Sequence, residues 1–356
     1  MRKVLVSICF LLCAFILKAQ GPEVIVPVPE KYVLSEGTYT FEGVPRVDAR
    51  IVPSRFDGRE DYSLEVNSRG VVIRAGGEAG LFYARQTLDQ MTSDGAVTEI
   101  RCCRIKDSPR YAYRGLHVDV SRHFRSVDFL KKQMDAMAFF KMNRMHLHLT
   151  DAAGWRLEIE AYPRLTRFAA WRPEALWKSW WNGGRRYADE GTEGAYGGYY
   201  TKEDIAELVS YAAERHIELI PEIEMPSHSE EVLAAYPELG CTGEAYKDSD
   251  FCVGNEDVFT FLETVLTEVM EMFPSEYIHI GGDEAGKEHW KTCPKCLRRM
   301  QDEDIADVDG LQSYMIRRIG NFIASKGRKM IGWDEILQGG LAPGAVVMSW
   351  RGTEGG

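Results

Sequence analysis

Several features are missing from this sequence, and each absence excludes a class of protein. Beyond the first 20 residues no segment is long and apolar enough to cross a membrane, and no fixed-period repeat or low-complexity tract is present. Basic clusters are also absent: 43 basic side chains stand against 54 acidic ones, and the formal net charge is −11. Because such a chain repels phosphate backbones, we expect no nucleic-acid partner, whereas a neutral substrate such as a sugar is compatible with this charge.

The N-terminal stretch has the composition of a secretory signal (residues 1–20). Arg2 and Lys3 precede the mostly apolar run Val4–Leu17, and small or polar residues come after it. This order predicts a segment removed on export, so we expect a periplasmic, cell-surface or secreted protein. An uncleaved membrane anchor is the alternative, but a run of 14 residues is short against the ~20 that span a bilayer. A lipoprotein signal fits less well, because a leucine rather than a small residue precedes Cys13.

Six of the eight cysteines lie beyond this signal, and an oxidising compartment would allow them to pair. Cys241 and Cys252 bracket a polar, glycine-containing loop, which predicts a disulfide between them. Cys293 and Cys296 have the spacing of half a zinc site, but no second pair of ligands follows them, which favours a small disulfide or free thiols. We therefore expect neither a metal nor a cofactor. The other two cysteines are Cys102 and Cys103.

Residues 22–108 have the pattern of a small α+β domain. Tyr62–Val66 alternates between apolar and polar residues, and Val71–Arg74 follows a turn as a second short strand. Ala79–Met91 has apolar residues at helical spacing. A proline at position 109 marks the boundary with the second domain.

From residue 111 to residue 356 expected strands alternate with expected helices. This alternation is typical of a parallel sheet with crossover helices, and the lack of a glycine-rich dinucleotide loop after the first strand favours a (β/α)8 TIM barrel over a doubly wound sheet. The expected strands are Leu116–Arg122, Met145–Asp151, Ile217–Met225, Tyr277–Glu284, Met330–Glu335 and Ala345–Arg351, and the expected helices are Val127–Phe140, Lys202–Arg215, Asp257–Phe273 and Leu311–Ser325.

Only six strands are expected, whereas a closed barrel of this type needs eight. The sixth strand would leave an apolar, unpaired edge. We therefore expect the catalytic domain to be incomplete at its C-terminus, so that the 356-residue chain is a fragment of a longer protein.

The residues at the strand ends indicate the chemistry, because barrel active sites lie at the C-terminal ends of the strands. Carboxylates, an arginine, a histidine and two tryptophans follow successive strands. Such a rim suits a sugar, since indole faces stack on C–H surfaces and charged groups bind hydroxyls. The residues concerned are Arg122, Asp151, His228, Asp283, Glu284, Trp333 and Trp350.

An ordered set of motifs at these strand ends resembles the family 20 glycoside hydrolases (β-N-acetylhexosaminidases). The resemblance covers essentially the whole chain after the signal, because residues 22–108 are also similar to the small N-terminal domain of that family. The motifs are YRGLHVDVSRHF (113–124), NRMHLHLTDAAGWRLEI (143–159), ELIPEIEMPSH (218–228), YIHIGGDE (277–284), GWDEI (332–336) and VMSWRG (347–352).

The resemblance implies an exo-acting enzyme that removes terminal, non-reducing N-acetylglucosamine or N-acetylgalactosamine from glycans. Glycosidases commonly place two carboxyl groups on opposite sides of the scissile bond, which sequence neighbours on a strand cannot easily do. The family instead uses the acetamido group of the substrate as nucleophile, with an oxazolinium intermediate and net retention. By this resemblance Glu284 is the general acid and base, and Asp283 orients the acetamido N–H, which needs Glu284 protonated and Asp283 ionised.

The resemblance also implies supporting roles for five residues. Arg122 would bind the 3- and 4-hydroxyls, Asp151 and His228 would form a pair that tunes Glu284, and Trp333 and Trp350 would wall the acetamido pocket. Further contacts of the family, a tryptophan, a tyrosine and acidic residues, come from strands seven and eight. Because these are missing here, we expect little or no activity from this chain alone.

Two rival functions remain open. His146 and His148 have metal-ligand spacing on a strand and could join His228 and Asp283 in a metal-dependent hydrolase. The other rival is a binding protein that keeps the sugar pocket without turnover.

The loop 152–200 is rich in aromatic residues, and either leaving-group subsites or simple packing would explain this composition.

Overall fold

Two units make up the chain, and each is described by itself. One is formed by residues 1–110 with 139–141, and the other by residues 111–138 with 142–356. The computed structural model describes residues 25–92 and 99–353, so the predicted signal lies outside the described residues. Among the residues described, no helix has the length and apolar character needed to cross a membrane.

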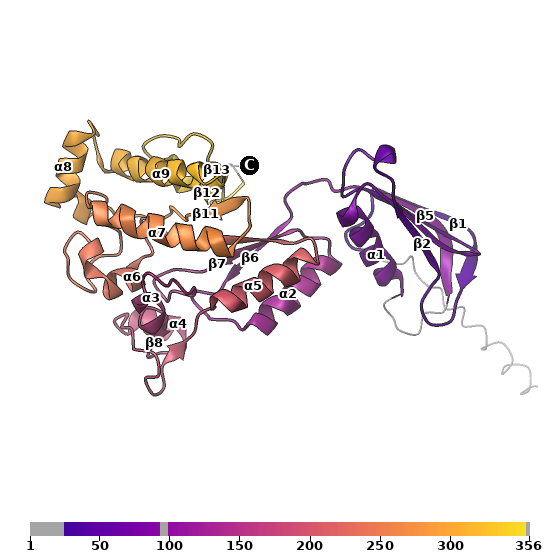
Figure 1. Ribbon diagram of the computed structural model, residues 1–356, viewed down its shortest axis with the longest axis horizontal. Coiled ribbons are helices and arrows are strands. Elements are labelled where there is room, and N and C mark those ends of the chain that lie inside the picture. The colour runs from indigo at the N-terminus through magenta and orange to yellow at the C-terminus, as the bar shows by residue number, and fades with distance from the viewer. Residues whose placement is uncertain (1–24, 93–98, 354–356) are drawn as a thin grey trace, which may run out of the picture. The chain divides into compact units, whose positions relative to one another are not determined.

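The N-terminal unit is a five-stranded sheet with one long helix, as the alternating pattern predicts (Figure 1). Tyr62, Leu64 and Val66 point alternately into the core and are almost fully buried, and Ala84 and Leu88 of the helix pack against the same core. The strand order is β1-β5-β3-β4-β2, and the elements are β1 (Lys31–Thr40), β2 (Val47–Ile51), β3 (Tyr62–Asn67), β4 (Gly70–Ala75), α1 (Glu78–Thr92) and β5 (Glu99–Asp107).

The second unit is built on a sheet of six parallel strands. Their order is β13-β12-β11-β10-β7-β6, which is the chain order of the strands of a (β/α)8 barrel. The predicted fold class is thus confirmed, with six barrel strands in the described part of the chain. The strands are β6 (Gly115–Asp119), β7 (Arg144–His148), β10 (Glu218–Glu222), β11 (Tyr277–His279), β12 (Lys329–Trp333) and β13 (Val346–Met348).

Long crossover helices cover one face of this sheet (Figure 1). α5 contacts β10 and α9 contacts β12, while α7 packs between α5 and α9. Polar side chains begin three of them: Thr201 forms a capping box with Asp204, and Asn255 and Asp307 each accept a hydrogen bond from a backbone N–H of the first turn. The long helices are α2 (Val127–Phe139), α5 (Lys202–Ala213), α7 (Glu256–Met272) and α9 (Val308–Ser325).

Shorter elements lie in the loops after the strands. A two-stranded ribbon and two short helices occupy the loop after β7, and two more short helices come after β10 and β11. These elements are α3 (Arg164–Arg167), β8 (Trp171–Arg172), α4 (Trp177–Asn182), β9 (Tyr196–Gly197), α6 (Glu230–Ala235) and α8 (Pro294–Asp302).

The barrel strands are shorter than the apolar runs predict. The run Met145–Asp151 is paired only to His148, and the run Tyr277–Glu284 is paired only to His279. Apolar residues continue past these strand ends because the loops at this rim are also buried, so hydrophobicity alone places the strand ends too late. The consequence is that the acid pair and Asp151 lie in loops just beyond the strands.

The parallel register brings polar residues to one level of the sheet. Asp119 of β6 lies opposite His148 of β7, and His148 in turn lies opposite Glu222 of β10. Glu222 also pairs with His279 of β11. Since alternate residues of a barrel strand face the interior, these side chains form one layer beneath the rim.

The aromatic loop after β7 is held mainly by packing. Trp155, Trp180, Tyr187 and Tyr200 are buried, with 7% exposure at most. The guanidinium of Arg156, itself fully buried, donates hydrogen bonds to backbone carbonyls at positions 121, 153, 170 and 198. Of the two explanations considered for these aromatic residues, packing accounts for the four buried ones.

Candidate active site

A cavity of about 300 Å³ opens beyond the C-terminal ends of the barrel strands, on the side where their loops meet. The structure brings all seven residues singled out from the sequence to this cavity, together with three others. Its lining consists of His117, Arg122, His148, Asp151, Glu224, His228, Asp283, Glu284, Trp333 and Trp350.

Two neighbouring acids face this cavity because the backbone turns sharply between β11 and the acids. Gly281 and Gly282 have φ of 66° and 97°, and Glu284 has φ of 51°, so the chain leaves extended geometry before the pair. Asp283 Oδ2 and Glu284 Oε2 both approach His228 Nε2, at 3.3 and 3.4 Å. Adjacent carboxylates thus converge on one imidazole, which they could not do on a regular strand.

Both glycines of this turn are required for steric reasons as well. A Cβ atom at Gly281 would lie 1.8 Å from Glu224 Oε2, and one at Gly282 would lie 2.4 Å from Ile336 Cγ2. The turn therefore passes directly over the Glu224 carboxyl group.

His228 links the acid pair to a buried carboxylate. Its Nδ1 lies 3.5 Å from Asp151 Oδ2, while its Nε2 faces Asp283 and Glu284. Burial opposes the charged imidazole, but the contacts with Asp151 and Asp283 prevail and raise the pKa of His228 to about 11. For Asp151 burial likewise favours the neutral form, but His148 and His228 hold its pKa well below the usual range. At neutral pH an imidazolium thus lies between one buried carboxylate and the acid pair.

Arg122 is held in the cavity wall by two carboxylates. Its Nη2 lies 2.6 Å from Asp151 Oδ2, and its Nη1 lies 3.1 Å from Asp119 Oδ2. Nη1 is also 2.8 Å from His148 Nε2. Burial lowers the pKa of Arg122, but the two carboxylates outweigh it and the net shift is upward. The guanidinium is therefore a fixed, permanent cation at the site.

The two tryptophans are oriented by hydrogen bonds to buried acids. Trp333, the last residue of β12, donates from Nε1 to Glu222 Oε1 at 2.9 Å. Trp350, which lies just after β13, donates from Nε1 to Glu335 Oε2 at 3.1 Å and is 49% exposed. Each indole presents a surface to the cavity from a fixed position.

Three further residues line the cavity: His117, His148 and Glu224, of which only His148 was considered from the sequence, as a metal ligand. Glu224 is 3% exposed, and neither of its carboxyl oxygens has a hydrogen-bond partner among the described residues. Burial, and next the negative charge of Asp283, raises the pKa of Glu224 well above its usual range, which favours the neutral carboxyl group. Strand alternation was the signal that could have found it, because Glu222 and Glu224 share the inward face with Asp119 and His148.

Beneath the cavity Glu222 is the centre of a buried network. His146 Nε2 and His148 Nδ1 lie 2.9 and 2.5 Å from Glu222 Oε2, and His279 Nδ1 lies 3.0 Å from Glu222 Oε1. The charges of these histidines overcome the effect of burial and hold the pKa of Glu222 well below its usual range. The Glu222 carboxylate in turn accepts the hydrogen bond from Trp333 Nε1.

This network separates the ligands of the rival metal-dependent hydrolase. Among the described residues, His146 groups with Glu222 and His279, whereas His148 groups with Asp151 and Glu224. His228 and Asp283 belong to a third group, with Glu284. The four proposed ligands therefore do not meet at one point.

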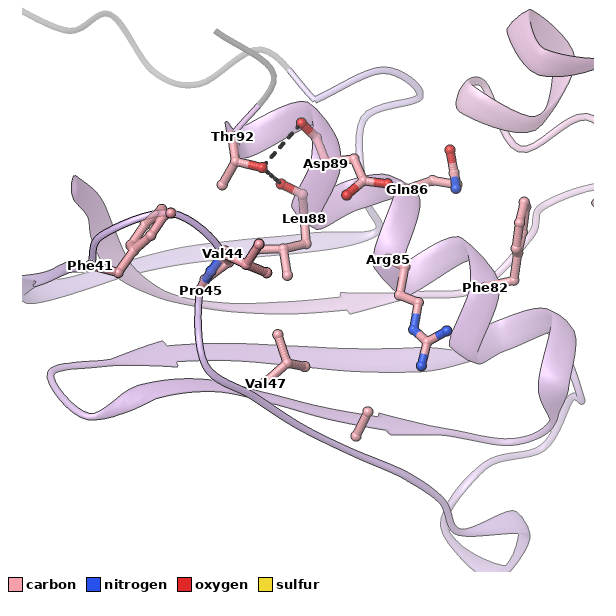
Figure 2. A pocket seen from close by; sticks show the side chains of 12 residues that line it. Phe41, Val44, Pro45, Val47, Phe82, Arg85, Gln86, Leu88, Asp89 and Thr92 are labelled. Carbon is pink, nitrogen blue, oxygen red and sulfur yellow. Dashed lines mark hydrogen bonds between the residues drawn. The ribbon is translucent and has the colours of Figure 1, made fainter. Parts of the chain in front are cut away.

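A larger cavity, of about 600 Å³, lies within the N-terminal unit between α1 and the segment around β2 (Figure 2). Its walls are mostly apolar, and Arg85 and Asp89 are the charged residues in the lining. Thr92 donates to the Leu88 carbonyl at 3.0 Å and closes the last turn of α1 here. Without a pair of carboxyl groups this cavity lacks the means for acid–base chemistry on a glycosidic bond.

Comparisons with known proteins identify the family of the chain. Residues 111–356 match "Glycosyl hydrolase family 20, catalytic domain", and residues 35–108 match "Glycosyl hydrolase family 20, domain 2". A beta-hexosaminidase of Porphyromonas gingivalis is 43% identical over 313 residues, which are 83% of this chain and 38% of that protein. A beta-hexosaminidase of Akkermansia muciniphila is 36% identical over 301 residues, which are 82% of this chain and 58% of that protein.

Solved structures agree. The beta-N-acetylhexosaminidase of Bacteroides fragilis superposes with a TM-score of 0.78 at 32% identity, covering 92% of this chain and 70% of that one. An exo beta-N-acetylglucosaminidase of Vibrio harveyi in complex with N-acetylglucosamine gives a TM-score of 0.82 at 28% identity, covering 93% of this chain and 57% of that one. The chain spans less than two thirds of the length of both curated relatives. Since the catalytic-domain match alone covers more than half of the chain, the chain belongs to glycoside hydrolase family 20.

Proposed function

We propose that this catalytic domain removes terminal, β-linked N-acetylhexosamine from the non-reducing ends of glycans. The observation that carries the proposal is the convergence of Asp283 and Glu284 on one imidazole at the cavity, with Arg122 in the same wall. The cavity of about 300 Å³ has room for a single sugar ring, which fits an exo-acting enzyme. The beta-hexosaminidase names of the relatives support the same reaction.

The mechanism is retaining and uses the substrate as its own nucleophile. The acetamido oxygen attacks C1 while Glu284 gives its proton to the leaving glycosidic oxygen, and a cyclic oxazolinium intermediate forms. Asp283 accepts a hydrogen bond from the acetamido N–H and stabilises the positive charge that develops on the ring. Glu284 then takes a proton from the water that attacks C1, and the acetamido group is released with the original configuration restored.

The other residues of the cavity hold this pair and the sugar in place. Asp151 and His228 form a charged pair next to Glu284, which keeps the acid pair directed at the cavity. Arg122 binds sugar hydroxyls through its planar fork, and Trp333 and Trp350 provide apolar walls for the acetamido methyl group.

Turnover depends on how many barrel strands surround the sugar. The described part of the chain supplies six barrel strands, and the family takes further sugar contacts from strands seven and eight. We therefore expect the 356-residue chain to hydrolyse chromogenic β-N-acetylhexosaminides weakly or not at all, and a form extended to eight strands to hydrolyse them readily.

The experiment compares these two forms on 4-nitrophenyl N-acetyl-β-glucosaminide and its galactosamine epimer. Proton NMR of the first product distinguishes the mechanisms, since retention gives the β-anomer before mutarotation. An α-anomer as first product would contradict the mechanism. Binding of N-acetylglucosamine by the extended form without turnover would instead identify a sugar-binding protein.

Export is part of the proposal, because the predicted signal of residues 1–20 would direct the enzyme to a compartment where glycans are accessible. N-terminal sequencing of protein recovered from cells that express the whole chain would test it. A mature protein starting close to residue 21 is expected, and one that keeps Met1 would contradict it.

A further inference from the structure

Four cysteines from two separate loops meet at one point in the catalytic unit. Their sulfur atoms all lie within 4.8 Å of one another, and three pairs are separated by 3.7 Å: Cys241 with Cys296, Cys252 with Cys293 and Cys252 with Cys296. All four are free thiols in the structure, so the expected disulfide between Cys241 and Cys252 is not formed. The second pair of ligands sought after Cys296 therefore exists, but it precedes Cys293 in the chain.

The spacing of the sulfur atoms matches a tetrahedral metal site. Zinc–thiolate bonds are about 2.3 Å long, which places sulfur atoms at the corners of a regular tetrahedron about 3.8 Å apart. Disulfide sulfurs, by comparison, are about 2.05 Å apart. Three of the six sulfur–sulfur separations are 3.7 Å, close to this tetrahedral spacing, and all six are within 4.8 Å.

Each pair is presented by a local structure suited to holding two thiols together. An isolated antiparallel bridge between Gly240 and Phe251 closes the first loop, and Cys241 and Cys252 each directly follow one of the bridged residues. In the second loop Cys293 is the N-cap of α8 and Cys296 lies one turn further along it. The positive end of a helix favours thiolates at these positions.

The surroundings are those of a closed site. Cys252, Cys293 and Cys296 are buried, and Cys241 is partly buried. The backbone N–H of Gly254 donates a hydrogen bond to the Cys296 sulfur, as is common around metal-bound thiolates. With four protein ligands no coordination position is left for water, which is the arrangement of a structural site and not of a catalytic one.

We propose that Cys241, Cys252, Cys293 and Cys296 bind one structural Zn²⁺ as a tetrathiolate. Binding releases the thiol protons to solvent and involves no change of oxidation state. The inference does not depend on the proposed glycosidase activity.

The metal would tie together the two loops that carry the catalytic residues. The first pair of cysteines lies in the loop after β10, which begins near His228, and the second pair lies in the segment after β11, which begins with the acid pair. Protein contacts already join these loops: the Lys287 N–H donates to Asp250 Oδ2 at 2.8 Å, and His289 Nδ1 lies 2.5 Å from Asp248 Oδ1. A zinc ion adds the strongest link among them.

The test is made on the whole chain, purified without chelators. Elemental analysis should find one zinc per chain, and replacement of zinc by cobalt(II) should give the sulfur-to-metal charge-transfer and intense d–d bands of a tetrahedral tetrathiolate. Cys252→Ser and Cys296→Ser should lose the metal. Cys102→Ala, a matched buried cysteine of the N-terminal unit, should keep it.

Cys241→His keeps the inference testable if the serine variants fail to fold. Because Cys241 is only partly buried, histidine can supply a nitrogen ligand, and the cobalt bands should then shift to those of a three-sulfur, one-nitrogen site. Two disulfides found by mass spectrometry in metal-free native protein would overturn the inference. A cobalt spectrum without thiolate bands, or one that is identical in wild type and Cys241→His, would do the same.

Discussion

Replacing Gly281 by alanine should disturb the turn that presents the acid pair, and the effect has two parts. The first is conformational, because φ at this residue is 66° and an L-residue there costs about 1–2 kcal/mol. The second is steric, since the new Cβ would lie 1.8 Å from Glu224 Oε2, whereas real Cβ atoms essentially never come closer than 3.0 Å. The carboxyl group must therefore move by roughly 1.2 Å in a buried position, at a further cost of about 1–3 kcal/mol.

Gly327→Ala is the matched control for this substitution. Gly327 has φ of 75° in the same unit, but nothing lies within 4 Å of a Cβ atom placed there. The control should lose only the conformational part, about 1–2 kcal/mol, whereas Gly281→Ala should lose about 2–5 kcal/mol.

Urea unfolding followed by tryptophan fluorescence measures the free energy of unfolding of the catalytic unit in both variants. All eight tryptophans lie beyond residue 150, so the signal comes from the catalytic unit alone. Isothermal titration with N-acetylglucosamine should show tenfold or weaker affinity for Gly281→Ala, which corresponds to about 1.4 kcal/mol. Equal stability of the two variants, with sugar affinity unchanged in Gly281→Ala, would refute the steric reasoning.

Three further predictions concern the charges at the cavity. The pKa of His228 is raised to about 11, so its charged contacts stabilise the fold fully below the unfolded pKa of about 6.5, and this stability is lost as pH rises toward 11. The free energy of unfolding in urea of the wild type should therefore exceed that of His228→Gln by an amount that shrinks between pH 7 and 10. A constant difference would contradict the prediction. The pKa of Glu224 is raised, so this group destabilises the fold increasingly as pH rises above its unfolded pKa. Glu224→Gln should be more stable than wild type at pH 8 and lose that advantage toward pH 4. A variant less stable than wild type at pH 8 would contradict the prediction. Arg122→Lys keeps the charge but loses the planar fork, so the binding free energy for N-acetylglucosamine, measured by isothermal titration, should weaken by about 1.5–3 kcal/mol. An unchanged affinity would show that Arg122 does not bind the sugar.

The fold class was predictable because periodicity and spacing are local properties of the chain. Alternating strands and amphipathic helices identified α2, α5, α7 and α9 to within a few residues of their observed ends. Strand ends were predicted less well, since the buried loops after β7 and β11 are as apolar as the strands. Strands β1, β2 and β5 were not singled out, because their pairing is between segments far apart in the sequence.

The site was predictable to the extent that its residues come after strand ends in a recognisable order. Arg122, Asp151 and the acid pair were found in this way. Glu224 was not assigned, and His148 was considered only as a metal ligand, because their places in the site depend on the register between neighbouring strands and on burial, which only the folded chain reveals. The grouping of the four cysteines was missed for a similar reason: a search for ligands after Cys296 could not find Cys252 and Cys241, which lie 41 and 52 residues before Cys293.

The rate of hydrolysis as a function of the substrate's N-acyl group tests the central claim most directly. In the extended form, aryl N-acyl-β-glucosaminides with zero to three fluorine atoms on the acetyl methyl group differ mainly in the basicity of the carbonyl oxygen. If that oxygen attacks C1 while Asp283 and Glu284 assist, kcat/KM should fall steeply with each fluorine, and the fluorine-free substrate should lose most of its rate in Glu284→Gln. A rate that does not depend on fluorination would contradict the account, because the nucleophile would then have to come from the protein or from water.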